Sequence, residues 1–193
     1  MLGEETKNIS STGKDFEIKI ENVVASVTLG VPVPLKKLTP IMNTEYDPTQ
    51  FPGLVYRITD PKAAALIFGS GKIICTGARS PELANVAIKK IVGVMRDAGL
   101  DIPEEYGTKV ENIVASAKME KELNLNSIAL SLENAEYEPE QFPGLVYRIT
   151  DPKVAFLLFG SGKIVCTGGK DIGQVENAIR KISIKLKEIE AYN

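Results

Sequence analysis

The sequence predicts an α+β fold in which two pseudo-symmetric repeats form one antiparallel sheet of about ten strands, with helices packed on a single face. Two observations predict it: a long internal duplication, and the same succession of strand and helix signals inside each copy. The duplicated blocks are QFPGLVYRITDPK at 50–62 and 141–153, FGSGKI at 68–73 and 159–164, and CTG at 75–77 and 166–168. Their offset of 91 residues, and of 90 for the earlier pair ENVVAS and ENIVAS, indicates a duplicated module and not a short-period solenoid.

A strand and a short helix open each repeat. Residues 16–29, FEIKIENVVASVTL, alternate and then become apolar, as a half-buried strand does. A short helix is expected around 34–42, with its counterpart around 123–133. Pro40 should shorten or kink the first of these, because proline inside a helix removes a hydrogen bond and costs about 3 kcal/mol.

The rest of each repeat reads as strands followed by a long helix. In the first copy the strands are LVYRI, AAALIF (63–68) and KIICTG (72–77), with Asp60-Pro61 and Gly69-Ser70-Gly71 as turns. Ser80 should cap a helix whose first residue is Pro81 and which ends near Gly99. Its expected apolar stripe is Leu83, Val86, Ala87, Ile91, Val94 and Met95. In the second copy the cap is Asp171 and the stripe is Val175, Ala178, Ile179, Ile182, Leu186 and Ile189.

This succession gives the domain organisation. Each unit is expected to run strand, short helix, four strands, long helix. Residues 1–14 are polar and predict a disordered tail, residues 15–105 the first repeat and residues 106–193 the second, joined by a link around 101–109.

Composition indicates an ordinary soluble globular protein. The chain has 193 residues, of which 44% are hydrophobic and 25% charged. Its start lacks a signal-peptide pattern, and no apolar run reaches the roughly 18 residues of a membrane span. Cys75 and Cys166 occupy equivalent places, and with no histidine and no CxxC they are expected to be small buried core residues. A disulfide or a metal site has little support, and a reducing cytosol is the inference.

Charge is segregated along the chain. Segments 50–79 and 141–170 each carry a net charge of +3, so the remainder carries −8 against a total of −2. Positive charge concentrated in the duplicated core is the pattern of a polyanion footprint. The alternative is solvated charge on strand edges.

The sheet face opposite the helices is apolar where water alone would favour polar residues. Strand periodicity places on it Val24, Val55, Leu66, Phe68, Ile74 and Thr76, with Val114, Val146, Leu157, Phe159, Val165 and Thr167 in the second repeat. A wide exposed apolar surface usually marks a binding site. A second core layer or an oligomer interface is the alternative. Because lysine and arginine lie at its rim, the surface favours a flat, anionic, partly apolar partner, a description that a DNA minor groove meets.

At these blocks, and over roughly residues 16–190, the chain resembles the TATA-box-binding protein family, as its core domain occurs in archaea. The resemblance implies a saddle-shaped, curved sheet with helices on the convex face. It also implies a general transcription initiation factor that binds the promoter TATA box in the minor groove of double-stranded DNA, bends it, and recruits transcription factor B and RNA polymerase. No cofactor and no membrane contact are implied, and the expected location is cytoplasmic, on the nucleoid of an archaeal cell.

The resemblance also implies residue roles. It implies that four phenylalanines intercalate between DNA base pairs: Phe51, Phe68, Phe142 and Phe159. Contacts to the bases fall to Asn22, Asn112, Thr76, Thr167, Val24, Ile74, Val114 and Val165, with Leu66, Leu157, Pro52 and Pro143 completing the apolar floor. Phosphate contacts fall to Arg57, Arg148, Lys72, Lys163, Ser70 and Ser161, with Arg79 and Lys170 as edge contributors. The loop YEPEQ, against YDPTQ in the first copy, makes Glu138 and Glu140 the expected contacts of transcription factor B.

Two other functions need to be distinguished from this one. GSGK lacks the GxxxxGK[ST] pattern of a phosphate-binding loop, and no cluster of catalytic residue types is apparent, so an enzyme is not expected. A duplicated domain that binds a protein or lipid through the apolar face would keep the sheet but would not need the paired asparagines.

Overall fold

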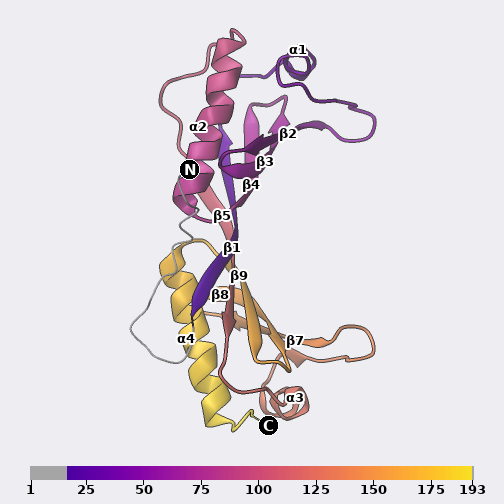
Figure 1. Cartoon of the computed structure of the whole chain (residues 1–193), viewed down its shortest axis with the longest axis vertical. Helices are drawn as coiled ribbons and strands as arrows, with labels where there is room; N and C mark the ends of the chain where they lie inside the picture. Colours follow the sequence, from indigo (N-terminus) through magenta and orange to yellow (C-terminus); the bar gives the residue numbers. More distant parts are fainter. Residues whose placement is uncertain (1–16, 193) are drawn as a thin grey trace. The chain divides into compact units, whose positions relative to one another are not determined.

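The computed structural model describes residues 17–192, which form four helices and nine strands in one antiparallel sheet. They divide into two compact units, here called the first unit (residues 22–111) and the second unit (residues 17–21 and 112–192). Figure 1 shows the chain coloured along its sequence. The tail predicted at 1–14 lies outside the described residues.

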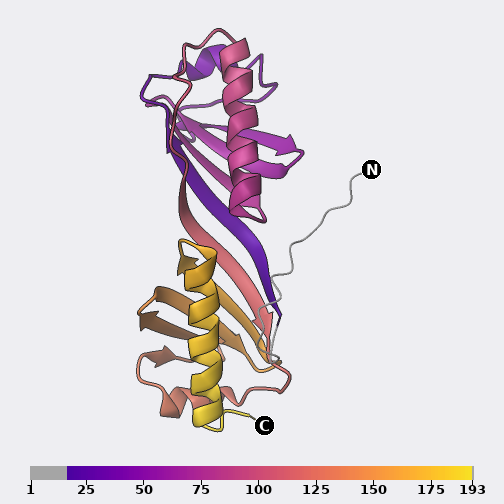
Figure 2. The same ribbon diagram turned by 90° about the vertical axis from the view of Figure 1, so that its left-hand side faces the viewer.

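The first unit holds one copy of the repeat. Its strands stand in the order β2-β3-β4-β1, and a long helix covers one face of them (Figures 1 and 2). The elements are β1 (Ile18–Thr28, whose first four residues belong to the second unit), α1 (Leu35–Leu38), β2 (Gly53–Thr59), β3 (Lys62–Phe68), β4 (Lys72–Ala78) and α2 (Pro81–Asp97).

The second unit repeats this arrangement with one more strand. Its order is β5-β9-β8-β7-β6, again with a long helix along one face. The elements are β5 (Lys109–Lys118), α3 (Leu125–Ser131), β6 (Ala135–Glu136), β7 (Gly144–Thr150), β8 (Lys153–Phe159), β9 (Lys163–Gly169) and α4 (Ile172–Glu188).

The predicted fold class is confirmed, with nine strands where about ten were expected. The difference lies in the first repeat, where no described strand corresponds to β6. In the second repeat Glu136 of β6 pairs with Val146 of β7. At the equivalent place in the first repeat, the Thr44 hydroxyl donates to the Val55 carbonyl at 2.7 Å, so a side chain takes the backbone group that a strand would use.

The helix boundaries follow their sequence signals. The Ser80 hydroxyl accepts from the Leu83 amide at 3.1 Å, and the Asp171 carboxylate accepts from the Gln174 amide at 2.8 Å, so both predicted caps are confirmed. Helix α1 ends at Leu38, two residues before Pro40, whereas α3 runs for seven residues.

The predicted stripe on α2 was partly wrong. Leu83 and Val86 are exposed, and the buried residues of the helix are Ala84, Ala87, Ile88, Ile91, Val92 and Met95. Apolar residues occur on more than one side of α2, so hydrophobic spacing alone did not fix which side faces the sheet. The stripe on α4 is confirmed at Val175, Ala178, Ile179, Ile182 and Leu186.

Each core lies between the sheet and its long helix. Along β4 the buried residues Ile73 and Cys75 alternate with half-buried Ile74 and Thr76. Cys75 and Cys166 are buried free thiols, as predicted. Burial raises the pKa of Cys75 to about 11 and that of Cys166 to about 12, so both stay protonated and unreactive at neutral pH. Among residues 17–192, no cluster of metal-ligating side chains is found.

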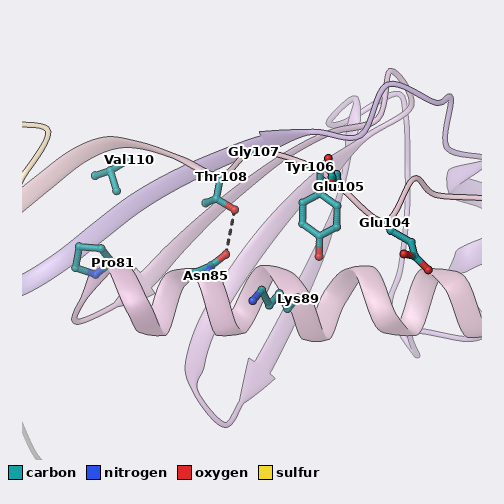
Figure 3. A pocket seen from close by; sticks show the side chains of 9 residues that line it. All are labelled: Pro81, Asn85, Lys89, Glu104, Glu105, Tyr106, Gly107, Thr108 and Val110. Carbon is teal, nitrogen blue, oxygen red and sulfur yellow. Dashed lines mark hydrogen bonds between the residues drawn. The ribbon is translucent and has the colours of Figure 1, made fainter.

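The link between the repeats packs along α2. Arg96 donates to the carbonyls of Ile102 and Pro103, and Thr108 donates to the Asn85 side chain at 3.1 Å. Between this segment and the helix lies a pocket of about 690 Å³, into which Lys89 and Tyr106 also project (Figure 3). Within the part of the chain that the structure describes, no helix is long and apolar enough to cross a membrane.

The loops that precede β2 and β7 differ in their side-chain bonding. In the first, the Asp47 carboxylate accepts from the Thr49 amide at 2.9 Å, the Thr49 hydroxyl at 2.6 Å and the Gln50 amide group at 2.9 Å. These bonds, above all the Thr49 hydroxyl, hold the pKa of Asp47 below its ordinary value. In the second, the backbone turn is kept but the Glu138 side chain makes no hydrogen bond within the described residues.

We predict that Asp47→Ala loosens the first loop locally, while Glu138→Ala leaves the second loop unchanged. The Thr49 amide loses its acceptor in the first variant, so its hydrogen-exchange protection factor, measured by NMR, should fall. In the unmodified protein the same protection should be present at neutral pH and lost as the pH falls through the lowered pKa of Asp47, because only the ionised carboxylate accepts all three bonds. Protection of Thr49 that is insensitive to both changes would contradict this account.

Candidate nucleic-acid interface

The sheet face opposite the long helix, here called the open face, carries the predicted site residues of each unit. In β1 and β4 the side chains under the helix are buried, whereas Asn22, Val24, Ile74 and Thr76 on the open face are half-buried. Period-2 alternation in the strands produces this separation. The open face is therefore a surface in each unit and not a second core layer within it.

Strand register aligns apolar side chains into one row in each unit. Val55 pairs with Leu66, Leu66 with Ile74, and Ile74 with Ser26. The corresponding row in the second unit is Val146, Leu157, Val165 and Ser116. The serine at the end of each row donates to a glutamate, Ser26 to Glu111 at 2.7 Å and Ser116 to Glu21 at 2.6 Å.

An asparagine, a threonine and a glycine form a polar cluster beside the first row. The Gly77 amide donates to Asn22 Oδ1 at 2.7 Å, and Asn22 Nδ2 donates to the Thr76 hydroxyl at 3.1 Å. Because an N–H can only donate, the Gly77 bond fixes which end of the amide is the oxygen. One Nδ2 hydrogen of Asn22 is then left over, while the Thr76 hydroxyl donates its own hydrogen back to Asn22 Oδ1 at 3.3 Å.

The second unit reproduces this cluster. The Gly168 amide donates to Asn112 Oδ1 at 2.7 Å, and Asn112 Nδ2 donates to the Thr167 hydroxyl at 3.1 Å. Both glycines have positive φ, 96° at Gly77 and 110° at Gly168, which a side chain would strain. The strand pairing is irregular beside both clusters, between Val23 and Ala25 and between Ile113 and Val114. The local backbone thus fixes the orientation of the asparagine side-chain amide, with its Nδ2 donor, in each unit.

A pair of phenylalanines lies beside each row, because Phe68 and Phe159 end β3 and β8 two residues after Leu66 and Leu157. The rings of Phe51 and Phe68 have centroids 6.0 Å apart at 62°, and those of Phe142 and Phe159 are 6.0 Å apart at 68°. Phe51 and Phe142 are exposed by 39% and 40%, although large aromatic rings are normally well buried.

A glycine beside each pair allows the rings to approach the backbone. A Cβ added at Gly53 would lie 2.7 Å from Phe51 and 3.1 Å from Phe68, and one at Gly144 would lie 2.7 Å from Phe142 and 3.0 Å from Phe159. Any side chain at these positions would therefore displace a ring. Pro52 and Pro143 connect each exposed ring to its glycine.

The predicted cations lie around the open face. Arg57 and Arg148 are in β2 and β7, Lys72 and Lys163 begin β4 and β9, and Ser70 and Ser161 lie in the turns before them. Arg79 and Lys170 directly follow β4 and β9. All are exposed, and among the five lysines and arginines other than Arg148 no side chain has a hydrogen bond or ion pair within the described residues. Among these predicted cations, only Arg148 forms an ion pair, in which its Nη1 lies 2.8 Å from Glu136 Oε1.

Most predicted residues are therefore brought together, and a few important ones were missed. The open face unites the asparagines, threonines, valines, isoleucine, leucines, phenylalanines and basic residues of each repeat, while Glu138 and Glu140 lie apart in the loop before β7. Sequence reasoning missed Gly53, Gly144, Asp47 and Glu136. The duplicated Pro-Gly pairs could have indicated Gly53 and Gly144, whereas nothing in the sequence pattern indicated the ion pair of Glu136 with Arg148.

Comparison with known proteins agrees with this geometry. A family model described as transcription factor TFIID, or TATA-binding protein, matches residues 17–98 and 107–189. The TATA-box-binding protein of Methanothermobacter thermautotrophicus is 55% identical over 177 residues, which cover 91% of this chain and 98% of that protein. TATA-box-binding protein E of Halobacterium salinarum is 51% identical over 175 residues, covering 89% and 94%.

A solved structure extends the likeness to the fold. The structure named Methanococcus jannaschii TBP has a TM-score of 0.84 and 53% sequence identity, and covers 89% of this chain and 98% of that chain. The two matched segments of the family model correspond to the two repeats. The chain belongs to the TATA-binding protein family.

Proposed function

We propose that this protein is a general transcription initiation factor that binds an A·T-rich promoter element, the TATA box, in the minor groove. Each unit would bind one half of the site through its open face. The observation that carries the proposal is the fixed amide cluster at Asn22 and Asn112, which presents donors beside an apolar row in both units. A lipid-binding or purely apolar protein-binding face would have no use for such oriented donors.

The chemistry of the groove explains the preference for A·T pairs. In the minor groove A·T and T·A show only acceptors, whereas G·C adds the N2 amino donor. Asn22 and Thr76 can donate to those acceptors. Val24 and Ile74, with Val114 and Val165 in the second unit, would instead press apolar groups against an N2 amino group and leave its donor buried and unpaired. Such an orphaned donor costs about 1–3 kcal/mol.

The phenylalanine pairs suit the proposed role of wedges. An apolar ring inserted between two base pairs replaces stacking that the kinked step loses, which is how minor-groove proteins bend DNA. Phe51 and Phe142 are already exposed, and Gly53 and Gly144 leave room for the second ring of each pair directly behind them. One wedge in each unit would kink one end of the site.

The cations complete the proposed interface. The proposed phosphate contacts are exposed cations whose side chains have no partner in the described chain, so a phosphate can bind them without breaking an existing side-chain bond: Arg57, Lys72, Lys163, Arg79 and Lys170. Such contacts position the protein and make binding salt-dependent without reading sequence.

We further propose that the loop before β7 recruits transcription factor B, and through it RNA polymerase. Glu138 and Glu140 are exposed there and their side chains make no hydrogen bond or ion pair within the described residues. The equivalent Asp47 and Thr49 of the first loop bond to each other. The second loop therefore offers two available carboxylates, which favours a basic partner surface.

The first prediction concerns groove choice. In a duplex that contains a TATA element, replacing A·T by I·C pairs keeps the minor-groove acceptors and changes the major groove, so binding should survive. Replacing A·T by G·C should weaken binding by about 5- to 150-fold per badly placed amino group, from the cost of an unpaired donor. Fluorescence anisotropy at fixed salt measures both. Equal losses for I·C and G·C would exclude minor-groove reading.

The second prediction concerns the wedge. Phe142→Ala should reduce DNA bending, because alanine cannot fill an opened base step, and energy transfer between dyes at the two duplex ends should fall. Leu130→Ala is the matched control, since it also removes an exposed apolar side chain. If the bend persists in Phe142→Ala at saturating protein, Phe142 is not a wedge.

The third prediction concerns the partner. The variant Glu138→Arg/Glu140→Arg should bind DNA at least as tightly as the unmodified protein but should not form the ternary complex with transcription factor B in a gel-shift assay. Glu120→Arg/Glu122→Arg makes the same charge change at exposed positions outside the loop and should form that complex normally. Failure of both variants, or of neither, would count against a docking role for the loop.

A further inference from the structure

The two arginines proposed to contact phosphate are not equivalent. Arg148 Nη1 lies 2.8 Å from Glu136 Oε1, in both an ion pair and a hydrogen bond. The backbone holds both partners in place, because Glu136 is in β6 and pairs with Val146, two residues from Arg148 on β7. The carboxylate is therefore fixed beside the guanidinium and does not reach it through a mobile loop.

The first unit has the same two residue types at the same places in its repeat, but not the pair. Glu45 and Arg57 correspond to Glu136 and Arg148, and both line a cavity of about 700 Å³ with Thr39, Pro40, Asn43, Thr44 and Val55. No strand equivalent to β6 is described here, and the Thr44 hydroxyl donates to the Val55 carbonyl instead. Arg57 thus has no acidic partner among the described residues.

We propose that Glu136 is a specificity-determining residue that competes with DNA phosphate for Arg148 and makes the two halves of the DNA site unequal. The inference rests on the proposed function. Arg57 meets a phosphate with its full charge and no bond to break. Arg148 must give up or share its bond to Glu136, and the carboxylate then faces the incoming phosphate with like charge.

Counterion release gives the size of the effect. Each phosphate contact made by an unpaired cation releases condensed ions and contributes about 0.9 to the slope of log K against log salt. An arginine that is already neutralised contributes less than this. Because both Arg148 and Glu136 are exposed, the competition is worth about a two- to five-fold change in affinity, the range for surface ion pairs.

The consequence is electrostatic asymmetry in a duplicated protein. The apolar row, the amide cluster and the wedges have the same geometry in both units. The arginine–glutamate pair differs between them. Arg57 of the first unit therefore contributes more to the salt dependence of binding than Arg148 of the second unit does. This difference gives the protein a basis for distinguishing the two ends of a nearly symmetric site.

The test compares Glu136→Gln with Glu45→Gln in binding to one labelled A·T-rich duplex over a range of KCl concentrations. Glutamine preserves the size of each side chain and removes the same charge, and both positions are exposed. Glu136→Gln should tighten binding about two- to five-fold at low salt. It should also steepen the salt slope by up to about 0.9. Glu45→Gln should change neither beyond the small long-range effect of one charge. Equal effects of the two variants would overturn the inference.

The double variant locates the effect at Arg148. In the Arg148→Gln background, Glu136→Gln should no longer tighten binding, and Arg57→Gln should reduce the salt slope more than Arg148→Gln does. Tightening that persists without Arg148, or equal slope losses for the two arginines, would refute competition at this pair while leaving DNA binding intact. No binding of the duplex by the unmodified protein would instead refute the proposed function, so the two failures are distinguishable.

Discussion

The structure depends on a constraint of strand geometry: in each unit the sheet has two faces and one long helix packs on it, so only one face is covered. Side chains alternate strictly along a strand, so the residues opposite the helix must meet either water or a partner. Here those residues form a half-buried apolar row in each unit, with Leu66 and Leu157 at the middle. The register of this row with the flanking strands places donors and cations around it.

The donors depend on the same register. The irregular pairing beside Asn22 and Asn112 brings a glycine amide with positive φ within 2.7 Å of each side-chain oxygen, in two copies that agree closely. Reproduction of this geometry in both copies means that the local sequence determines it. The backbone of β4 or β9 therefore orients the amide before any ligand arrives, and such preorganisation lowers the entropic cost of binding.

Much of the fold could be predicted because the duplication provided each signal twice. The strands, the caps at Ser80 and Asp171, the truncation of α1 by Pro40 and the buried cysteines all follow from local rules. The buried side of α2 could not be predicted, since Leu83 and Val86 are as apolar as the residues that face the sheet. A fourth strand after the short helix was expected in each repeat, but β6 could not be located because two residues show no periodicity, and the ion pair of Glu136 depends on that strand.

The two repeats share many core positions and also differ in charge at their edges. Leu54, Ile73 and Cys75 recur unchanged as Leu145, Ile164 and Cys166, but buried Ala65 is replaced by buried Phe156, so the two close-packed cores are filled differently. At the edge, the Asp47 carboxylate accepts hydrogen bonds within its own loop, whereas the Glu138 carboxylate remains available. Glu136 forms an ion pair with Arg148, whereas the equivalent Glu45 does not pair with Arg57. Each unit taken alone has the same amide cluster and phenylalanine pair, while its apolar row carries Ile74 in the first unit and Val165 in the second. The edge residues add an electrostatic difference between the units, because charge can be changed there without disturbing the core.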